Sequence, residues 1–194
     1  NYVMLLTGQP LHMYDKDKLT SDEFIVRNDV EGDFTALDDK TYQIKNGDLC
    51  VTVDNKVCCL GGIMGSKNCQ VDENTKNVIV ESANFLGSTI RRTSVRIGLS
   101  SESSAHFVKG IDPYQDEDVL SLAANLLVEL ADAKIIYKTN RYTTLDYSEI
   151  EIPCSYSYIN KRLGYEFSVE QMNDVFRRLD IKIKNIDEDN FIAY

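Results

Sequence analysis

The chain has 194 residues and a net charge of −10, with 43% hydrophobic and 27% charged residues. This length can form one good core, or one domain plus part of another, and the composition is typical of a folded globular protein rather than a disordered one. Its apolar runs are far too short to cross a bilayer, so we expect no contact with a membrane. The acidic balance argues against a broad phosphate-binding surface but permits a pocket that receives only the end of an RNA.

The five cysteines are odd in number and contain no C-x-x-C pair. Cys58 and Cys59 lie in an apolar run, where a thiol behaves as a small hydrophobe, so we expect reduced core cysteines in a cytoplasmic protein. With only two histidines, His12 and His106, the chain offers no convincing zinc ligands, and no metal site is expected. The chain starts without methionine, so we expect its true start, and any targeting signal, to be missing.

Short strand patterns fill the first half of the chain. Apolar or alternating segments bounded by turn residues predict strands at 24–27, 41–44, 49–53, 57–60 and 77–81. The apolar residues 1–7 predict either a strand or a short helix before the break at Gly8. Three glycines within 61–65 fit either a bulge at a strand corner or a loop that presents backbone N–H groups to a ligand, and the residues alone weigh the two equally.

Helix patterns follow. We expect a helix at 85–96 with Ser88 as its N-cap. Asp112 followed by Pro113 predicts the start of a longer helix whose acidic first turn complements the helix dipole. The apolar residues spaced three and four apart on this helix predict a packing face; they are Leu120, Ala123, Ala124, Leu127 and Leu130.

A polar connector at 142–151 indicates a domain boundary, and we divide the chain into 1–147 and 148–194. The predicted elements of the second part are a helix at 156–163, a helix opened by a capping box at 168–171, and a strand at 181–184. This tail is too short to be a complete domain.

Six motifs occur in one order between Gly8 and Pro113. They are G-Q-P-L-H-M-Y-D at 8–15, G-G-I-M-G at 61–65, V-E-S-A-N-F at 80–85, I-R-R-T-S at 90–94, G-L-S-S-E-S-S at 98–104 and K-G-I-D-P at 109–113. Each motif alone is weak, but the ordered set resembles the beta subunit of bacterial phenylalanine–tRNA ligases. The tail resembles that family's following module through Y-I-N-K-R-L-G at 158–164 and the capping box.

The resemblance implies an α+β fold. Residues 1–147 would be a mixed editing domain with a barrel-like β core, and 148–194 the start of a small helical, winged-helix-like module. The implied activity is hydrolysis of the ester of mischarged tyrosyl-tRNA(Phe); the parent ligase attaches phenylalanine to tRNA(Phe) using ATP and Mg. The implied partners are the 3′ end of aminoacylated tRNA and the ligase alpha subunit, and no cofactor is expected in this segment.

Editing has a physical reason. A pocket shaped for phenylalanine only partly rejects tyrosine, which adds one hydroxyl. A carboxylate that accepts the phenol O–H reverses this preference, because bound phenylalanine would leave it desolvated and unpaired, at a cost of roughly 1–3 kcal/mol. Glu81 ends an apolar strand and matches the family's tyrosine-recognising glutamate. Without the resemblance, a solvated strand-end glutamate is an equally good interpretation.

Five other residues match positions near the family's site. His12 would orient the ester, the ribose or the attacking water, since no Asp or Ser is clearly placed with it for a triad; a structural histidine is the alternative. Gly65 would offer a backbone N–H to the oxyanion. Ser101 would help to hold the water, while Ser103 and Asn1 would lie against the substrate.

Two departures from the family limit this assignment. His106 and Val108 replace residues that are commonly arginine and glutamate, so no role is carried onto either, and an arginine that the family supplies before Asn1 is absent from the chain. A non-catalytic tRNA-positioning or subunit-assembly module of the same ligase is the alternative function. A two-carboxylate hydrolase is disfavoured because no second carboxylate pairs convincingly with Glu81.

Overall fold

A computed structural model describes residues 1–135, 139–146 and 148–194, and the chain divides into two compact units, Asn1–Lys138 and Thr139–Tyr194. Both units mix helices and strands, so the α+β class is confirmed. The predicted boundary falls at residue 147, which lies outside the described residues. The division into domains at 1–147 and 148–194 therefore stays a prediction.

The described residues of the first unit form four α-helices, eight strands and two short 3-10 helices. In chain order they are α1 (Tyr2–Thr7), β1 (Leu11–Asp15), η1 (Lys16–Lys18), β2 (Ile25–Arg27), β3 (Gly32–Thr35), β4 (Thr41–Ile44), β5 (Cys50–Val53), β6 (Lys56–Leu60), β7 (Met64–Gly65), η2 (Lys67–Cys69), β8 (Val78–Ser82), α2 (Gly87–Ile97), α3 (Glu102–Lys109) and α4 (Asp116–Ala131).

These strands form three separate antiparallel sheets, with the orders β2-β5-β6-β7, β3-β4 and β1-β8. A barrel requires one continuous ladder around its axis. Here β7 contributes only two residues, and a single bridge between Ala36 and Ser66 joins the β3–β4 hairpin to the four-stranded sheet. The expected barrel-like core is therefore corrected: within the described residues, none of the sheets closes into a barrel.

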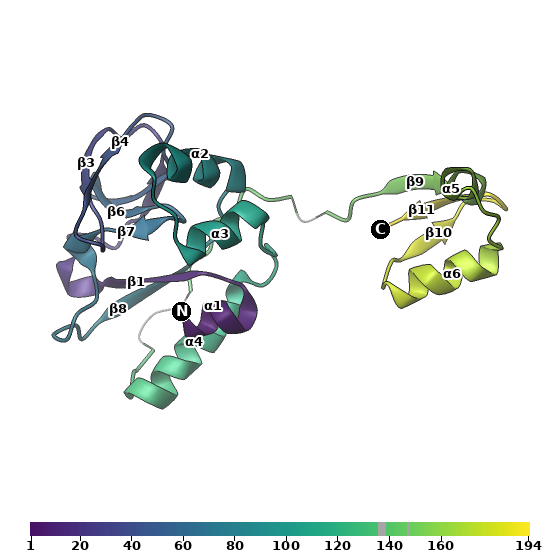
Figure 1. Ribbon diagram of the computed structural model, residues 1–194. Coiled ribbons are helices and arrows are strands. Elements are labelled where there is room, and N and C mark those ends of the chain that lie inside the picture. Colours follow the sequence, from purple (N-terminus) through teal and green to yellow (C-terminus); the bar gives the residue numbers. More distant parts are fainter. Residues whose placement is uncertain (136–138, 147) are drawn as a thin grey trace. The chain divides into compact units, whose positions relative to one another are not determined.

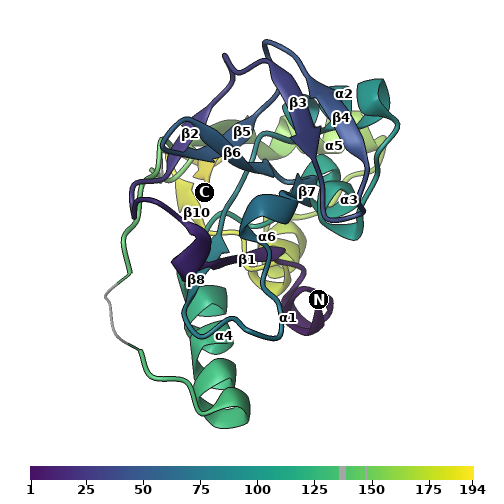
Figure 2. The same ribbon diagram turned by 90° about the vertical axis from the view of Figure 1, so that its left-hand side faces the viewer.

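The β1–β8 ribbon carries the residues on which the functional argument depends. His12 lies directly opposite Glu81 in its register, and Tyr14 lies opposite Ile79. Opposed residues of an antiparallel pair share a face, as do alternate residues along one strand, so these four side chains lie on the same face. In both views the ribbon lies between the four-stranded sheet on one side and α1 and α4 on the other (Figure 1 and Figure 2).

Two apolar clusters fill the first unit. One joins the β3–β4 hairpin to α2 and α3 through Phe34, Leu60, Ile90 and Phe107. The other surrounds Tyr14 with β5 residues and with three of the cysteines. All five cysteines are free and four are buried, as expected for reduced thiols used as small core residues.

Three helix predictions change in the structure. Ser88 lies inside the first turn of α2 and the N-cap is Leu86, so the predicted cap is wrong. α4 begins at Asp116 rather than next to Pro113, because the Asp112 carboxylate accepts the Tyr114 N–H at 2.9 Å and forms a turn instead. The predicted α4 face also ends early, since Leu130 is 76% exposed.

The second unit contains β9 (Ile152–Ser155), α5 (Tyr156–Leu163), α6 (Val169–Arg178), β10 (Ile183–Asn185) and β11 (Asn190–Ala193). Its strands form one antiparallel sheet in the order β10-β11-β9, and its core is built on Tyr156, Met172 and Phe191. The predicted capping box at Ser168 is confirmed. The winged-helix-like assignment stays a prediction.

Candidate functional site

Glu81 is a strand-end glutamate whose carboxylate has an internal partner. The Tyr14 hydroxyl, on a side chain with no exposed surface, donates a hydrogen bond to Glu81 Oε2. Burial raises the pKa of Glu81 and the hydrogen bond from Tyr14 opposes this, leaving the pKa above its ordinary value. Burial and the nearby Glu81 charge raise the pKa of Tyr14, so the phenol remains a neutral donor.

The other oxygen of Glu81 has no hydrogen-bond partner among the described residues. Its side chain is only partly buried, and Oε1 is not enclosed away from solvent. An ionised carboxylate has about four acceptor positions, so one donated hydroxyl leaves room for another. Among the residues that the structure describes, no second carboxylate contributes to the Glu81 pKa, which does not favour a two-carboxylate site.

His12 packs against the backbone of Gly65. A methyl group built on Gly65 would lie 2.7 Å from His12 Nε2 and closer still to Cε1, so only glycine allows the imidazole to approach this strand. The ring also meets Tyr14 edge-on, with centroids 4.5 Å apart. The structure therefore places His12 against Gly65 and opposite Glu81, and Tyr14 contacts both His12 and Glu81.

The His12 imidazole is neutral near physiological pH. Burial lowers its pKa from 6.5 to about 4. A neutral ring has one donor and one acceptor nitrogen, which suits the orientation of an ester or a water molecule. A base with so low a pKa is weak at neutral pH, so the positioning role fits better than proton abstraction.

The glycine loop combines a tight turn with close packing. Ile63 donates its N–H to the Leu60 carbonyl at 2.9 Å, and Gly62 has φ of 67° in the left-handed region. The Gly65 carbonyl accepts the Leu37 N–H at 3.1 Å. The turn at a strand corner is thus observed, while presentation of a Gly65 N–H to an oxyanion stays a prediction.

Ser101 connects this loop to α3. Its hydroxyl donates to the Ile63 carbonyl at 2.6 Å and accepts the Ser104 N–H at 3.1 Å, as part of a capping box. Its single proton is therefore used on the backbone two residues before Gly65. Only the remaining lone pair of the hydroxyl is available for a water molecule.

The last two predicted residues, Ser103 and Asn1, make their contacts with α1. The Ser103 hydroxyl lies 3.8 Å from the Met4 sulfur, which joins α3 to α1. Asn1 is exposed at the start of α1, and its carbonyl accepts the Leu5 N–H at 2.9 Å. Within the described part of the chain, neither residue has a recorded hydrogen bond or ion pair with His12, Gly65 or Glu81.

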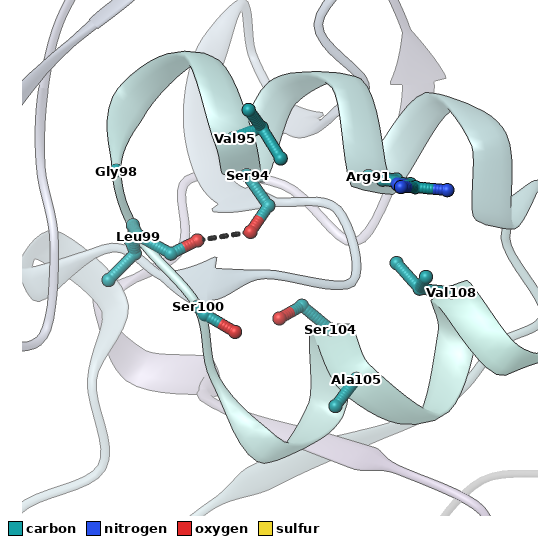
Figure 3. Close-up of a pocket in the computed structure, with 9 residues that line it drawn as sticks. All are labelled: Arg91, Ser94, Val95, Gly98, Leu99, Ser100, Ser104, Ala105 and Val108. Atoms are coloured by element: carbon teal, nitrogen blue, oxygen red, sulfur yellow. Dashed lines mark hydrogen bonds between the residues drawn. The ribbon is translucent and has the colours of Figure 1, made fainter.

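A separate cavity of about 370 Å³ lies between α2 and α3 (Figure 3). It is lined by Arg91, Ser94, Val95, Gly98, Leu99, Ser100, Ser104, Ala105 and Val108. None of the six predicted site residues lines it, although Ser100 and Ser104 flank positions that were predicted. The cavity is an open groove between two helices, and we do not assign the chemistry to it.

Two residues that received no role in the sequence analysis belong to the site region. Tyr14 is two residues after His12, so strand alternation alone places it on the same face. Gln9 is fully buried and donates its amide to the Ala83 carbonyl at 2.8 Å, tying the turn before β1 to the residue after β8. Its Oε1 lacks a partner among the described residues, a feature that no sequence pattern could indicate.

Metal-ligating side chains do not gather in the parts of the chain that the structure describes: no group of three or more His, Cys, Asp or Glu residues is placed to hold an ion. In the same residues, no helix has both the length and the apolar character needed to cross a membrane.

The curated relatives include proteins called phenylalanine–tRNA ligase beta subunit from three bacteria. The Streptococcus thermophilus protein is 36% identical over 98% of this chain and 24% of its own length. The Bacillus cereus protein is 35% identical over 96% of this chain and 23% of its own length. The Streptococcus pneumoniae protein is 37% identical over 92% of this chain and 22% of its own length.

The chain thus spans about a quarter of the length of the curated relatives it matches. A solved N-terminal fragment of the phenylalanyl-tRNA synthetase beta subunit from Pyrococcus horikoshii aligns with 95% of this chain and 53% of its own, at 14% identity and a TM-score of 0.42, which is too weak to support an argument. The resemblance predicted from the six motifs is nevertheless confirmed by the sequence relatives. The sequence model of the B3/4 domain matches residues 1–132, and the chain belongs to the B3/4 domain family.

Proposed function

We propose that this chain is the editing region of a phenylalanine–tRNA ligase beta subunit and hydrolyses the ester of tyrosyl-tRNA(Phe). The observation that carries the proposal is the Glu81 carboxylate, which lies opposite His12, accepts one phenol O–H from Tyr14 and keeps an unoccupied oxygen among the described residues. The phenol of a substrate tyrosine fits that oxygen. Phenylalanine would leave it desolvated and unpaired.

The remaining residues take roles around the ester. Water attacks the ester carbonyl, the bond to the ribose oxygen breaks, and that oxygen takes up a proton, releasing tyrosine and tRNA. The neutral His12 ring would orient the water or the ester, and a Gly65 N–H would stabilise the oxyanion. Ser101 would contribute chiefly by holding the loop in place, while Ser103 and Asn1 would act at the edge of the substrate.

Features of the whole ligase are part of the same proposal. They include attachment of phenylalanine to tRNA(Phe) with ATP and Mg, assembly with an alpha subunit, delivery of the tRNA 3′ end to this chain and residence in the cytoplasm. The name of the curated relatives, phenylalanine–tRNA ligase beta subunit, supports the ligation of phenylalanine to tRNA and a second subunit, and this chain covers about a quarter of their length.

The test compares hydrolysis of tyrosyl-tRNA(Phe) and phenylalanyl-tRNA(Phe) by the intact ligase carrying Glu81 or Glu81→Gln. Loss of a hydrogen bond to a charged acceptor is worth about 1.5–3 kcal/mol, so we expect the preference for tyrosyl-tRNA to fall by about tenfold to a hundredfold. Glu102→Gln is the matched control, because it removes an exposed carboxylate from the nearby start of α3.

An enzyme that releases tyrosine no faster than phenylalanine contradicts the editing proposal. A preference that survives Glu81→Gln contradicts the assignment of Glu81 alone. The alternative, a tRNA-positioning or assembly module without hydrolysis, is supported by the Tyr14–Glu81 hydrogen bond, which a purely structural glutamate would also make. That alternative predicts no ester hydrolysis by the wild-type ligase or by the Glu81→Gln variant.

A further inference from the structure

The Tyr14 side chain is rigidly held beside the carboxylate of Glu81. It is fully buried, its ring centroid lies 5.1 Å from that of Phe24 and 4.5 Å from that of His12, and the His12 ring is nearly perpendicular to it. Its cross-strand partner is Ile79, two residues before Glu81, so the phenol reaches the carboxylate along the diagonal of the ribbon. A donor fixed in this way determines where one carboxylate oxygen lies.

We propose that Tyr14 is a positioning residue for tyrosine selection, holding Glu81 by Oε2 so that Oε1 is directed to the substrate phenol. This inference rests on the proposed editing function. A glutamate side chain has three rotatable bonds, and a partly buried carboxylate without a partner would turn toward solvent. The charge-assisted bond from a neutral phenol removes that freedom and leaves acceptor positions open.

The hydrogen bond from Tyr14 favours the ionised form of Glu81, whose two oxygens can only accept hydrogen bonds. The titratable groups that face Glu81 among the described residues are Tyr14 and His12 on β1 and Cys59 on β6. Burial raises the pKa of the Cys59 thiol well above its ordinary value, and His12 is neutral above a pKa of about 4. Because the pKa of Glu81 is raised above its ordinary value, Glu81 is the member of this group whose charge changes first as the pH falls from neutral.

Acid should reduce the preference for tyrosyl-tRNA. Glu81 selects tyrosine when ionised, so the preference is present above its pKa and is lost as pH falls through it. Tyr14→Phe removes the one interaction that lowers the pKa of Glu81 and leaves the burial that raises it. The loss of preference must then occur at higher pH in the variant than in the wild type.

The experiment measures kcat and KM of the intact ligase for tyrosyl-tRNA and phenylalanyl-tRNA from about pH 4 to about pH 8, a range that begins below the ordinary pKa of a glutamate and ends well above it. We expect Tyr14→Phe to lower the tyrosyl preference about tenfold at neutral pH, the size expected for one charge-assisted hydrogen bond, mainly through KM, and to move the midpoint of the pH profile upward. Tyr42→Phe is the matched control, because the half-buried Tyr42 donates its phenol to a carboxylate, Asp38, at 2.7 Å outside the β1–β8 ribbon.

A packing control separates positioning from stability. Phe24→Leu loosens the contact with Tyr14 but keeps its hydroxyl, and we expect it to leave the pH midpoint unchanged. A Tyr14→Phe enzyme with the wild-type preference and midpoint overturns the inference, as does a midpoint that Phe24→Leu shifts equally. If the wild type shows no tyrosyl preference, the editing proposal itself fails.

A second measurement covers a Tyr14→Phe protein that does not fold. 3-Fluorotyrosine at position 14 keeps the ring and is a stronger donor, because its phenol is more acidic. We expect it to move the midpoint of the preference to lower pH, and an unchanged midpoint overturns the inference.

Discussion

His12 occupies a position that its neighbours define closely. Its ring lies against a glycine on one side and edge-on to Tyr14 on another, and it faces Glu81 across the ladder. A protonated imidazole would have to be accommodated in the same space with little water around it. The protein therefore holds this histidine in its neutral form.

This burial predicts a pH dependence of stability. The pKa of His12 falls from 6.5 to about 4 on folding, so between these values the unfolded chain binds a proton that the native chain does not. The free energy of unfolding should then decrease as pH is lowered through this window, by at most about 1.4 kcal/mol per pH unit. In His12→Gln this contribution should be missing, which urea unfolding at a series of pH values would measure.

His106→Gln is the control for removing an imidazole elsewhere, since His106 lies on α3. A His12→Gln chain that loses stability with acid as steeply as the wild type contradicts the prediction.

At the scale of elements, the start of α3 is the junction that holds the glycine loop. Ser101 caps the helix and also donates to the Ile63 carbonyl, whereas Ser168 caps α6 through a capping box that Gln171 closes. The two serines can be compared as caps, because each accepts the N–H of its third helical residue, whereas only Ser101 also donates to a carbonyl outside its helix. The comparison therefore separates the capping contribution from the loop contact.

We expect Ser101→Ala to lower the free energy of unfolding by about 2 kcal/mol and Ser168→Ala by about 1 kcal/mol. Denaturant unfolding of each variant, followed by circular dichroism, provides the measurement. Equal losses would show that the Ser101–Ile63 bond contributes nothing beyond the cap. Restoration by Ser101→Thr, which keeps a hydroxyl, would support the assignment.

Several elements were predictable from local pattern, and others depended on contacts distant in sequence. The strand ending at Glu81 and the capping box at Ser168 are encoded by neighbouring residues, and the structure contains both. α3 was not predicted, because serines favour turns as readily as caps and its helical start depends on Ser104 returning a bond to Ser101. The Asp112 carboxylate likewise forms a turn with the Tyr114 N–H instead of capping a helix, because a short polar side chain can do either.

The candidate site was predicted as a set of residues but not as an arrangement. His12, Gly65 and Glu81 were chosen through their motifs, and the structure places them together. Their register could not be read from the chain, since alternation shows which residues share a strand face but not which strand lies opposite. The closure of the sheets, which was wrongly expected, likewise depends on pairing between segments far apart.

At the scale of the whole molecule, the net charge of −10 constrains how RNA could bind. A chain that grips a tRNA along its backbone would need many lysine and arginine contacts with phosphates. A chain that receives only the 3′ end of the tRNA needs one or two such contacts. The acidic composition therefore fits the second arrangement within the proposed editing function.

This difference is measurable through salt. For hydrolysis of a short tyrosylated 3′-end oligonucleotide by the intact ligase, we expect log(kcat/KM) to fall with log[salt] with a slope of magnitude below about 1.5, equivalent to one or two single-strand phosphates. Full-length tyrosyl-tRNA(Phe), which would contact other parts of the ligase, serves as the reference and should give a steeper slope. A steep slope with the short substrate would contradict the 3′-end model.

The pairing of β1 with β8 has a consequence for the order of events in folding. Tyr14 and Glu81 are 67 residues apart in the sequence, and the segment between them contains two of the three sheets of the first unit. Closing so long a loop is entropically costly until the intervening strands have compacted it. The hairpins between them can form first from local contacts, and the ribbon can then close over them. Under the proposed editing function, the ability to hydrolyse the ester should therefore be among the last properties that the folding chain acquires.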